Sequence, residues 1–576
     1  MQHAESSPLA ADAIAGVTDA RLCAVIADHW EFMMRWSPTY ATTLGDHRYD
    51  AVLAPSDAAA IARYHADRDA LIARLVALDA HSLGDADRVT YQLLRAGLEA
   101  DRGTDVCRAW EWSVASDSQS PLGYLSYLVE MHTVKQARDA ENLISRLGMG
   151  ATMIDDTIAN LSAGLASGRV ASAEKVRRAI EQVDNELAKP TGEWAMANPT
   201  WSASWPALHA QLRDVVTAQI QPAVARYRDF LRDRVLPKAR VDHEGIGALP
   251  DGDACYRASI VVHVGLAMTP DELHQLGVAE IARTDAALAA LGAKALGTTS
   301  LAETIARLRG DRSLYFESRE QILAAAQRSL DAAKAAIPRF FSLLPKSDCV
   351  MRETPAYEAP FSTVAYYREP HYDGSKPGEY FVNTYKPETR SRYELEALTW
   401  HESIPGHHLQ IAIAQELGAL PAFRKLGGST AFVEGWALYT ERLAEEMGLY
   451  SGDLDRLGQL SFDAWRAARL VVDTGIHAMG WTRARAEQFM RDHTALTEIN
   501  ISNEVDRYIG WPGQALAYKV GQLEILKLRD EAERALGERF DLRAFHAVVL
   551  DAGAVTLPVL GERVRAWITS SAAAEL

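Results

Sequence analysis

Residues 392–415 read RYELEALTWHESIPGHHLQIAIAQ, a stretch with four side chains able to do chemistry: His401, Glu402, His407 and His408. In the HExxH helix of zinc enzymes, two histidines four positions apart lie on one face and bind the metal, and the Glu after the first acts as general base. HESIPGHH resembles that motif, but the residue four positions after His401 is not His. The stretch therefore predicts a metal site on a helix whose backbone is altered.

Proline stands where the second ligand of HExxH would lie. Pro405 cannot donate to the carbonyl of His401 and its ring clashes there, while Gly406 relaxes the backbone further. We therefore predict a local break in the helix. If the break loops out two residues, His407 takes the ligand position, and His408 is the alternative second ligand.

A tetrahedral zinc site with an open catalytic position needs a third protein ligand. The predicted helix Ala431–Gly448 follows after one loop and could return antiparallel to the first, bringing a carboxylate to the metal. We choose Glu434, because it stands among apolar and aromatic neighbours, where a charge needs a partner. The other acids of this helix lie in a charged stretch: Glu441, Glu445 and Glu446. The plainer interpretation of Glu434 is a carboxylate that complements the helix dipole.

A later segment, WRAARLVVDTGIH, places four polar residues at spacings of three to four: Arg466, Arg469, Asp473 and His477. They share one helical face, which fits either a buried ladder of ion pairs or a face turned towards a substrate. In the second case, His477 or Arg469 binds a substrate carboxylate or polarises a carbonyl. Tyr518, in PGQALAYK, is a candidate phenol donor to the tetrahedral oxyanion, or else a core tyrosine.

One region differs from the helical remainder: residues 366–387, YYREPHYDGSKPGEYFVNTYKP. Its short aromatic and β-branched run, Tyr380–Tyr385, predicts a strand just before the metal motif. An exposed strand there could bind an extended peptide by edge pairing, and a buried hairpin without a ligand is the alternative. We take Tyr380, Asn383 and Arg469 as the candidate substrate-binding residues.

The remaining sequence is that of a large, mainly α-helical protein. Its 576 residues are 48% hydrophobic and 24% charged, and apolar positions recur at helical spacing over most of the length. Pro, Gly and polar residues are dense between residues 235 and 252, so we place a lobe boundary near residue 245. The expected fold is a bilobed helical metallopeptidase-like body with a small β-sheet near the active site. Its N-terminal lobe spans 1–245 and its catalytic lobe 246–576, and the lobes could interleave.

The charge and cysteine content narrow the partners and the compartment. The formal net charge is -17, and no basic run is present to neutralise phosphates, which excludes nucleic acids and membrane surfaces as main partners. The four cysteines are far apart and form no CxxC pair, which argues against a disulfide scaffold. Residues 1–16 show no secretory signal, and no apolar stretch approaches 18 residues. The simplest placement is cytoplasmic, or periplasmic if a leader has been removed.

Several segments resemble the DUF885 family of bacterial proteins: HExxPGHxxQ at 401–410, FVEGWALY at 432–439, VVDTGIHAMGW at 471–481, RYIGWPGQALAYKVG at 507–521 and the opening HWEFMMRWSPTYATTLGDHRYD at 29–50. The resemblance covers nearly the whole chain. The family is grouped with gluzincin-type zinc metallopeptidases, whose third ligand is a Glu. The resemblance implies zinc on His401, His407 and Glu434, with Glu402 as base, and it supplies no substrate.

Together these features predict a zinc-dependent hydrolase that cleaves peptide bonds of short peptides. Zinc would polarise the scissile carbonyl, Glu402 would move a proton from water to the leaving amine, and Tyr518 or His477 would stabilise the oxyanion. Two alternatives remain. The same zinc site could hydrolyse a non-peptide amide, or the chain could be a metal-free helical binding protein with a degenerate site.

Overall fold

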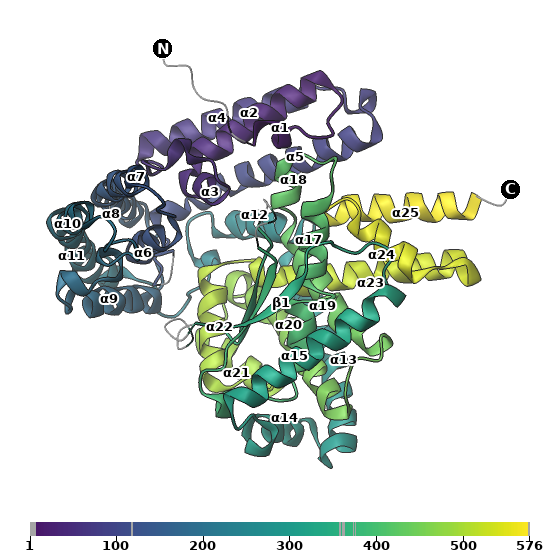
Figure 1. The fold of residues 1–576 in the computed structure, drawn as a ribbon. Helices are drawn as coiled ribbons and strands as arrows, with labels where there is room; N and C mark the ends of the chain where they lie inside the picture. The colour runs from purple at the N-terminus through teal and green to yellow at the C-terminus, as the bar shows by residue number, and fades with distance from the viewer. Residues whose placement is uncertain are drawn as a thin grey trace. The chain divides into compact units, whose positions relative to one another are not determined.

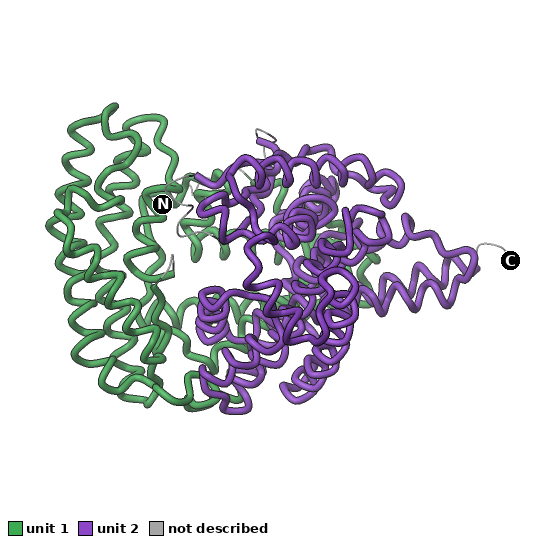
Figure 2. Tube along the Cα trace, turned by 90° about the horizontal axis from the view of Figure 1, so that it is seen from below, with its two compact units in different colours: residues 1–255 green, residues 256–576 purple. Residues whose placement is uncertain are grey.

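The computed structural model describes residues 7, 9–116, 119–355, 359, 363–371, 374 and 376–573. It confirms the predicted fold class, because these residues are mainly α-helical and include one small β-sheet (Figure 1). None of the helices in the described ranges combines the length and apolar character that a bilayer crossing requires. The chain divides into two compact units, Met1–Cys255 and Tyr256–Leu576 (Figure 2). The sequence placed the division at residue 245.

The first unit consists of helices packed around an apolar core. Its helices are α1 (Ala10–Ala13), α2 (Ala20–Trp36), α3 (Pro38–Thr43), α4 (Ala58–Val76), α5 (Asp85–Gly103), α6 (Pro121–Met131), α7 (Ala137–Gly148), α8 (Gly150–Ser167), α9 (Ala173–Leu187), α10 (Pro206–Val215) and α11 (Gln221–Phe230). Leu125, Leu143, Ile154 and Val176 are buried in this core. Polar residues cap the starts of helices. At α2, for example, the Asp19 side chain accepts hydrogen bonds from two backbone N–H groups of the first turn.

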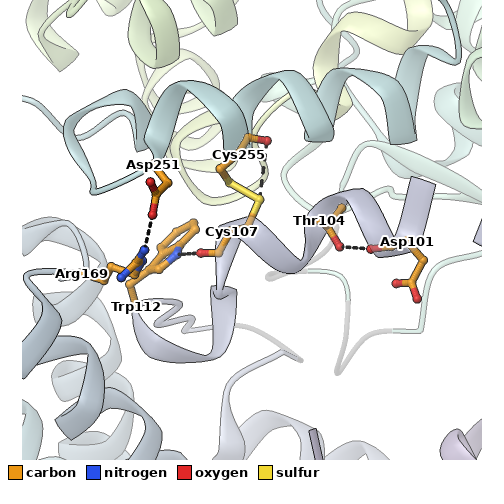
Figure 3. The surroundings of a disulfide bond; sticks show 7 residues. All are labelled: Asp101, Thr104, Cys107, Trp112, Arg169, Asp251 and Cys255. Carbon is orange, nitrogen blue, oxygen red and sulfur yellow. Dashed lines mark hydrogen bonds and ion pairs between the residues drawn. A yellow bond between two sulfur atoms is a disulfide. The ribbon is translucent and has the colours of Figure 1, made fainter. Parts of the chain in front are cut away.

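A disulfide bond joins Cys107 and Cys255 within the first unit (Figure 3). Cys107 ends a short 3-10 helix that follows α5, and Cys255 lies in α12 (Gly252–Val264). The two cysteines are 148 positions apart, so no local spacing could reveal the pair. Cys23 and Cys349 are free. One long-range disulfide is compatible with the prediction that the fold is no disulfide scaffold, but the pairing itself was not foreseen.

The second unit holds every residue of the predicted metal site. Its helices are α13 (Pro270–Leu296), α14 (Leu301–Gly310), α15 (Arg319–Ala336), α16 (Leu395–Glu402), α17 (His407–Glu416), α18 (Ala422–Leu426), α19 (Thr430–Glu446), α20 (Asp453–Ala478), α21 (Arg483–His493), α22 (Glu498–Gly510), α23 (Ala517–Leu536), α24 (Leu542–Leu550) and α25 (Leu557–Ala573). α13 packs along α20, α19 packs along α23, and α16 contacts α15, α19 and α20. α20 is buried along most of its length. The motif helix α16 is therefore held between a central buried helix and α19.

The sheet of the second unit has three strands in the order β1-β3-β2: β1 (Cys349–Glu353), β3 (Gly378–Val382) and β2 (Ala365–Arg368). β3 runs parallel to β1 and antiparallel to β2, and Tyr380 lies between Met351 and Tyr367 in the register. The predicted strand 380–385 therefore exists, although it starts two residues earlier and ends at Val382.

The position of β3 corrects one prediction. β3 is the central strand and pairs on both sides, so it has no free edge and cannot add an extended peptide. The sheet does lie beside the predicted site. The Tyr367 hydroxyl is 2.9 Å from Nδ1 of His408, and the Tyr380 hydroxyl is 3.0 Å from Oγ1 of Thr399 in α16. The sheet thus supports the two helices that carry the histidines.

Two glycines form the crossing of α19 and α23. A Cβ on Gly521 would fall against the carbonyl of Ala431, and a Cβ on Gly435 would meet the backbone of Gly521. The helices approach this closely because neither glycine has a side chain. The crossing lies next to Glu434 and three residues from Tyr518, so it sets the spacing between two candidate site residues.

Replacing Gly521 with Ala is expected to destabilise the second unit by about 1–3 kcal/mol, because the added methyl group must push two packed helices apart. Gly310→Ala is the matched control, since Gly310 ends α14 with open space where its Cβ would lie. The melting temperatures of the two variants, measured without metal, test this. Equal melting temperatures would show that the helices separate at this crossing without cost.

Candidate metal centre

The motif helix breaks where Pro405 predicts a break. α16 ends at Glu402 and α17 begins at His407, and the four residues between them leave the helical conformation. The backbone N–H of His408 donates to the carbonyl of Ser403 at 3.0 Å, which spans the break. A Cβ on Gly406 would fall against the carbonyl of His401. The PG pair therefore allows the chain to fold tightly back and start a new helix at His407.

This break brings His407 to the predicted cluster. His401, His407 and Glu434 each offer one possible ligand atom, and these atoms all lie within 4.8 Å of one another. Oε2 of Glu434 lies 3.8 Å from Nε2 of His401 and 3.6 Å from Nε2 of His407. The two imidazole rings stand almost perpendicular, at 85°. Three side chains from α16, α17 and α19 thus point at one small volume.

The chemistry of these three groups fits a divalent transition metal. Oε2 of Glu434 and Nδ1 of His407 are buried without a hydrogen-bond partner among the described residues. A buried carboxylate oxygen without a donor is costly, and a cation between it and the two imidazoles would remove that cost. Two His nitrogens and one carboxylate form a common donor set of catalytic zinc, which leaves a fourth position for water or substrate. The donor set therefore fits zinc.

The protonation states of the histidines agree with this. Burial lowers the pKa of His401 well below its usual value, and nearby positive charge lowers it further. Burial also lowers the pKa of His407, against an opposing effect of the Glu434 carboxylate. Both imidazoles are therefore neutral near pH 7, which is the form that binds metals.

Glu441 is a partner of this centre that the sequence did not assign. Its Oε1 lies 2.7 Å from Nδ1 of His401, and its side chain is fully buried. Burial raises the pKa of Glu441 to about 8, against the lowering effect of Arg466. When this carboxyl group is ionised it only accepts, so Nδ1–H of His401 donates to it and Nε2 keeps a lone pair facing Glu434. Glu441 follows Glu434 by seven residues, two helical turns on the same face. That spacing was the available signal, but the charged neighbours of Glu441 argued against a role.

Replacing Glu441 with Ala is expected to weaken zinc binding about 10- to 100-fold, because His401 loses the acceptor that fixes its tautomer and its orientation. The control is Glu445→Ala on the same helix, whose carboxylate is half exposed and pairs with Arg456. Zinc titration against a competing chelator measures both affinities. Unchanged affinity in the Glu441 variant would mean that His401 needs no support from this carboxylate.

Glu402 is the predicted general base. It ends α16, directly after His401, and is half-buried. Burial, reinforced by the Glu434 carboxylate, raises the pKa of Glu402 to about 8. A carboxyl group whose pKa lies near neutrality can take up and release a proton at the pH of the cell.

Two predicted site residues are held elsewhere. Nδ1 and Nε2 of His408 face the Tyr367 hydroxyl and the Ser347 carbonyl, at 2.9 and 3.2 Å, so the structure brings His407 and not His408 to Glu434. His477 is 1% exposed, and its Nε2 is 2.9 Å from the carbonyl of Tyr508. The structure therefore does not bring His477 into the cluster, and its Nε2 is engaged by a backbone carbonyl.

Tyr380 and Asn383, predicted to bind substrate, use their polar groups inside the protein. Tyr380 has no exposed surface, and its hydroxyl pairs with that of Thr399. Asn383 is 1% exposed and donates to the carbonyls of Ala359 and Thr363 at 2.8 and 3.0 Å. Both polar groups are used to hold the sheet and its loop. The sequence could not distinguish such internal bonds from contacts to a ligand.

The polar face of α20 divides into two parts. Asp473 accepts from the Tyr256 hydroxyl at 2.6 Å and from the backbone N–H of Gly513, so it ties helices together. Arg466 and Arg469 instead lie near candidate site residues: Arg466 beside Glu441 and Arg469 beside Tyr518. Tyr518 keeps its candidate role, because it is half-buried and the pKa of its hydroxyl is raised by burial and by the nearby Glu434 carboxylate.

The fold and the cluster together define a mainly α-helical protein with a His/His/Glu centre on a broken helix and the helix after it. The family described as "Bacterial protein of unknown function (DUF885)" matches residues 38–564, so the chain belongs to the DUF885 family. This confirms the resemblance seen in the motifs. A search of curated proteins found no match.

Two solved structures share the fold. One is described as "the putative lipoprotein from Colwellia psychrerythraea"; it is 26% identical, with a TM-score of 0.86, over 96% of this chain and 100% of that one. The other is "a putative lipoprotein of unknown function from Shewanella oneidensis", 21% identical, with a TM-score of 0.74, over 94% of this chain and 98% of that one. The whole fold, both units included, is therefore shared with these proteins.

Proposed function

We propose that this protein is a zinc-dependent hydrolase of the gluzincin type that cleaves peptide bonds of short peptides. The observation that supports the proposal most directly is the meeting of Nε2 of His401, Nε2 of His407 and Oε2 of Glu434. A general base lies beside them, because Glu402 is the next residue after His401.

Zinc held by these three residues would polarise the scissile carbonyl and lower the pKa of a bound water molecule. Glu402 would accept the proton of the attacking water and pass it to the leaving amine, for which its raised pKa is suited. The Tyr518 hydroxyl would donate to the oxyanion that develops on the substrate. His477 takes no part, since its Nε2 is occupied by a backbone carbonyl.

The burial of the ligands favours slender substrates. The side chains of His401, His407 and Glu434 are 4%, 12% and 19% exposed. A peptide bond on the surface of a folded protein could not reach groups at this depth, whereas a short or extended peptide could. A non-peptide amide of similar width would reach them too, so it is the alternative substrate for the same site.

We also propose that the chain works outside the cytoplasm. The Cys107–Cys255 disulfide supports this, since such bonds persist in oxidising compartments such as the periplasm. Both structural relatives are described as a "putative lipoprotein", a class of protein that is attached to membranes outside the cytoplasm. Export is the alternative to the cytoplasmic placement expected from the sequence. Labelling of free thiols in unfolded protein taken from intact cells, with and without prior reduction, would test it, because a chain without the disulfide would label at four cysteines before reduction and a chain with it at two.

The proposed function is tested by zinc content, thermal stability and hydrolysis measured together. We expect about one zinc ion per chain, a melting temperature that rises on adding zinc to the chelated protein, and cleavage within a panel of dipeptides, tripeptides and N-acyl amino acids. Chelation should abolish that cleavage. A chain that takes up no zinc and gains no stability from it would instead be a metal-free binding protein.

A further inference from the structure

Two buried arginines of α20 carry N–H groups that find no hydrogen-bond acceptor among the described residues. Arg466 and Arg469 are 4% and 3% exposed. Nε and Nη1 of Arg466, and Nη1 of Arg469, have no hydrogen-bond partner in the described ranges. A buried guanidinium is stable only when its charge and its donors are matched, so this arrangement lacks an acceptor.

Both arginines lie one side chain away from the metal centre. Nη2 of Arg466 is 3.7 Å from Oε1 of Glu441, the same oxygen that contacts His401. The guanidinium carbon of Arg469 lies 4.3 Å from the centre of the Tyr518 ring. The two arginines thus border the proposed metal ligand on one side and the proposed oxyanion donor on the other.

The acids around these arginines are already shared. Oε2 of Glu504 accepts from Arg469 and from Arg507, at 3.1 Å in each case. The oxygen of Glu441 that faces Arg466 is shared with His401. Oε2 of Glu441 also lacks a hydrogen-bond partner among the described residues, and it forms no hydrogen bond with either arginine, so the unpaired N–H groups remain. The missing acceptor has the chemistry of a further carboxylate.

Aromatic rings lie against the two arginines. Both guanidinium carbons lie 4.4 Å from the centre of the Trp465 ring, and Arg469 also lies against Tyr518. Trp465 and Tyr518 are half-buried and keep some exposure, unlike the arginines. The rings cover the faces of the guanidinium groups and leave their edges, and the edge of a guanidinium is the part that binds a carboxylate.

Building on the proposed peptidase function, we propose that Arg466 and Arg469 bind the C-terminal carboxylate of the substrate, so that the enzyme is an exopeptidase acting at carboxyl ends. If the arginines hold the C-terminal carboxylate of a peptide, a peptide bond near that terminus lies at the metal centre, because both arginines border that centre. The same N–H groups could donate to the carboxylate of a substrate Asp or Glu side chain, and the experiment separates the two sources.

The test uses binding as well as cleavage. Zinc-loaded Glu402→Gln protein, which should not turn over substrate, is titrated calorimetrically with trialanine, with trialanine amide and with an amidated tripeptide containing Glu. Trialanine is expected to bind at least about 30-fold more tightly than its amide, since losing one partner of a buried charge pair costs about 2 kcal/mol or more. Tight binding of the amidated Glu peptide alone would overturn the proposal in favour of side-chain recognition.

Two variants assign the effect to the arginines. In Arg466→Gln and Arg469→Gln, the preference for the free acid over the amide should fall about tenfold or more, while zinc content stays at the wild-type value. Arg456→Gln, on the exposed part of α20, is the control. Equal binding and equal cleavage of acid and amide by the parent protein would overturn the inference and leave the peptidase proposal standing. The peptidase proposal fails separately, through absence of zinc or of hydrolysis in the wider panel.

Discussion

Replacing His407 with Ala is expected to abolish stoichiometric zinc binding, whereas replacing its neighbour His408 with Ala should leave zinc bound. Of these two neighbours, His407 is the one that points at Glu434, with its Nε2 3.6 Å from Oε2. Loss of one of three protein ligands removes a bond that the remaining two cannot replace. Metal analysis after dialysis against a weak chelator measures the difference directly.

The His408 variant controls for general damage to the fold. His408 is fully buried and contacts Tyr367 and Ser347, so its removal should lower the melting temperature without releasing zinc. His407→Ala should lower the melting temperature of the zinc-loaded sample to that of the chelated sample. The opposite pattern, zinc lost from the His408 variant and retained by the His407 variant, would refute the assigned ligands.

Replacing Glu402 with Gln is expected to lower the rate of peptide hydrolysis about 10²- to 10⁴-fold while zinc remains bound. An amide of the same shape cannot accept the proton of the attacking water, and Glu402 is not one of the three converging ligands. Steady-state rates on the best peptide of the panel, with zinc content measured on the same samples, give both numbers.

Glu396→Gln is the matched control for this variant. Glu396 lies on the same helix, α16, and its carboxylate accepts from the backbone N–H of Ser451 instead of facing the metal centre. Its replacement should leave the rate within a few-fold of wild type. Full activity in the Glu402 variant would remove the general base from the mechanism and require another proton acceptor.

The predictions that agree with the structure rest on local chemistry. Pro405 excludes a regular helix whatever surrounds it, so the break and the new helix at His407 could be placed from the sequence. Glu434 stood out because a charge among apolar neighbours needs a partner, and the structure sets its oxygen between two imidazoles. Helical periodicity over most of the chain likewise sufficed for the fold class.

The candidate residues that lie outside the cluster have distant partners. His477 is engaged by the carbonyl of Tyr508, and Tyr380 by the hydroxyl of Thr399. Each side chain looked available in the sequence because its partner belongs to another element. The support that Glu441 gives to His401, 40 positions away, was hidden for the same reason. A polar residue in an apolar segment shows that some partner exists, and only the packed structure shows which.

The crossing of α19 and α23 has an evolutionary consequence. Gly435 and Gly521 meet backbone to backbone, with Glu434 beside one and Tyr518 one turn before the other. A larger residue at either position would move the carboxylate and the phenol together. Relatives are therefore expected to keep both glycines or to change both. A pair of compensating substitutions would mark a lineage in which the distance between the carboxylate and the phenol has changed.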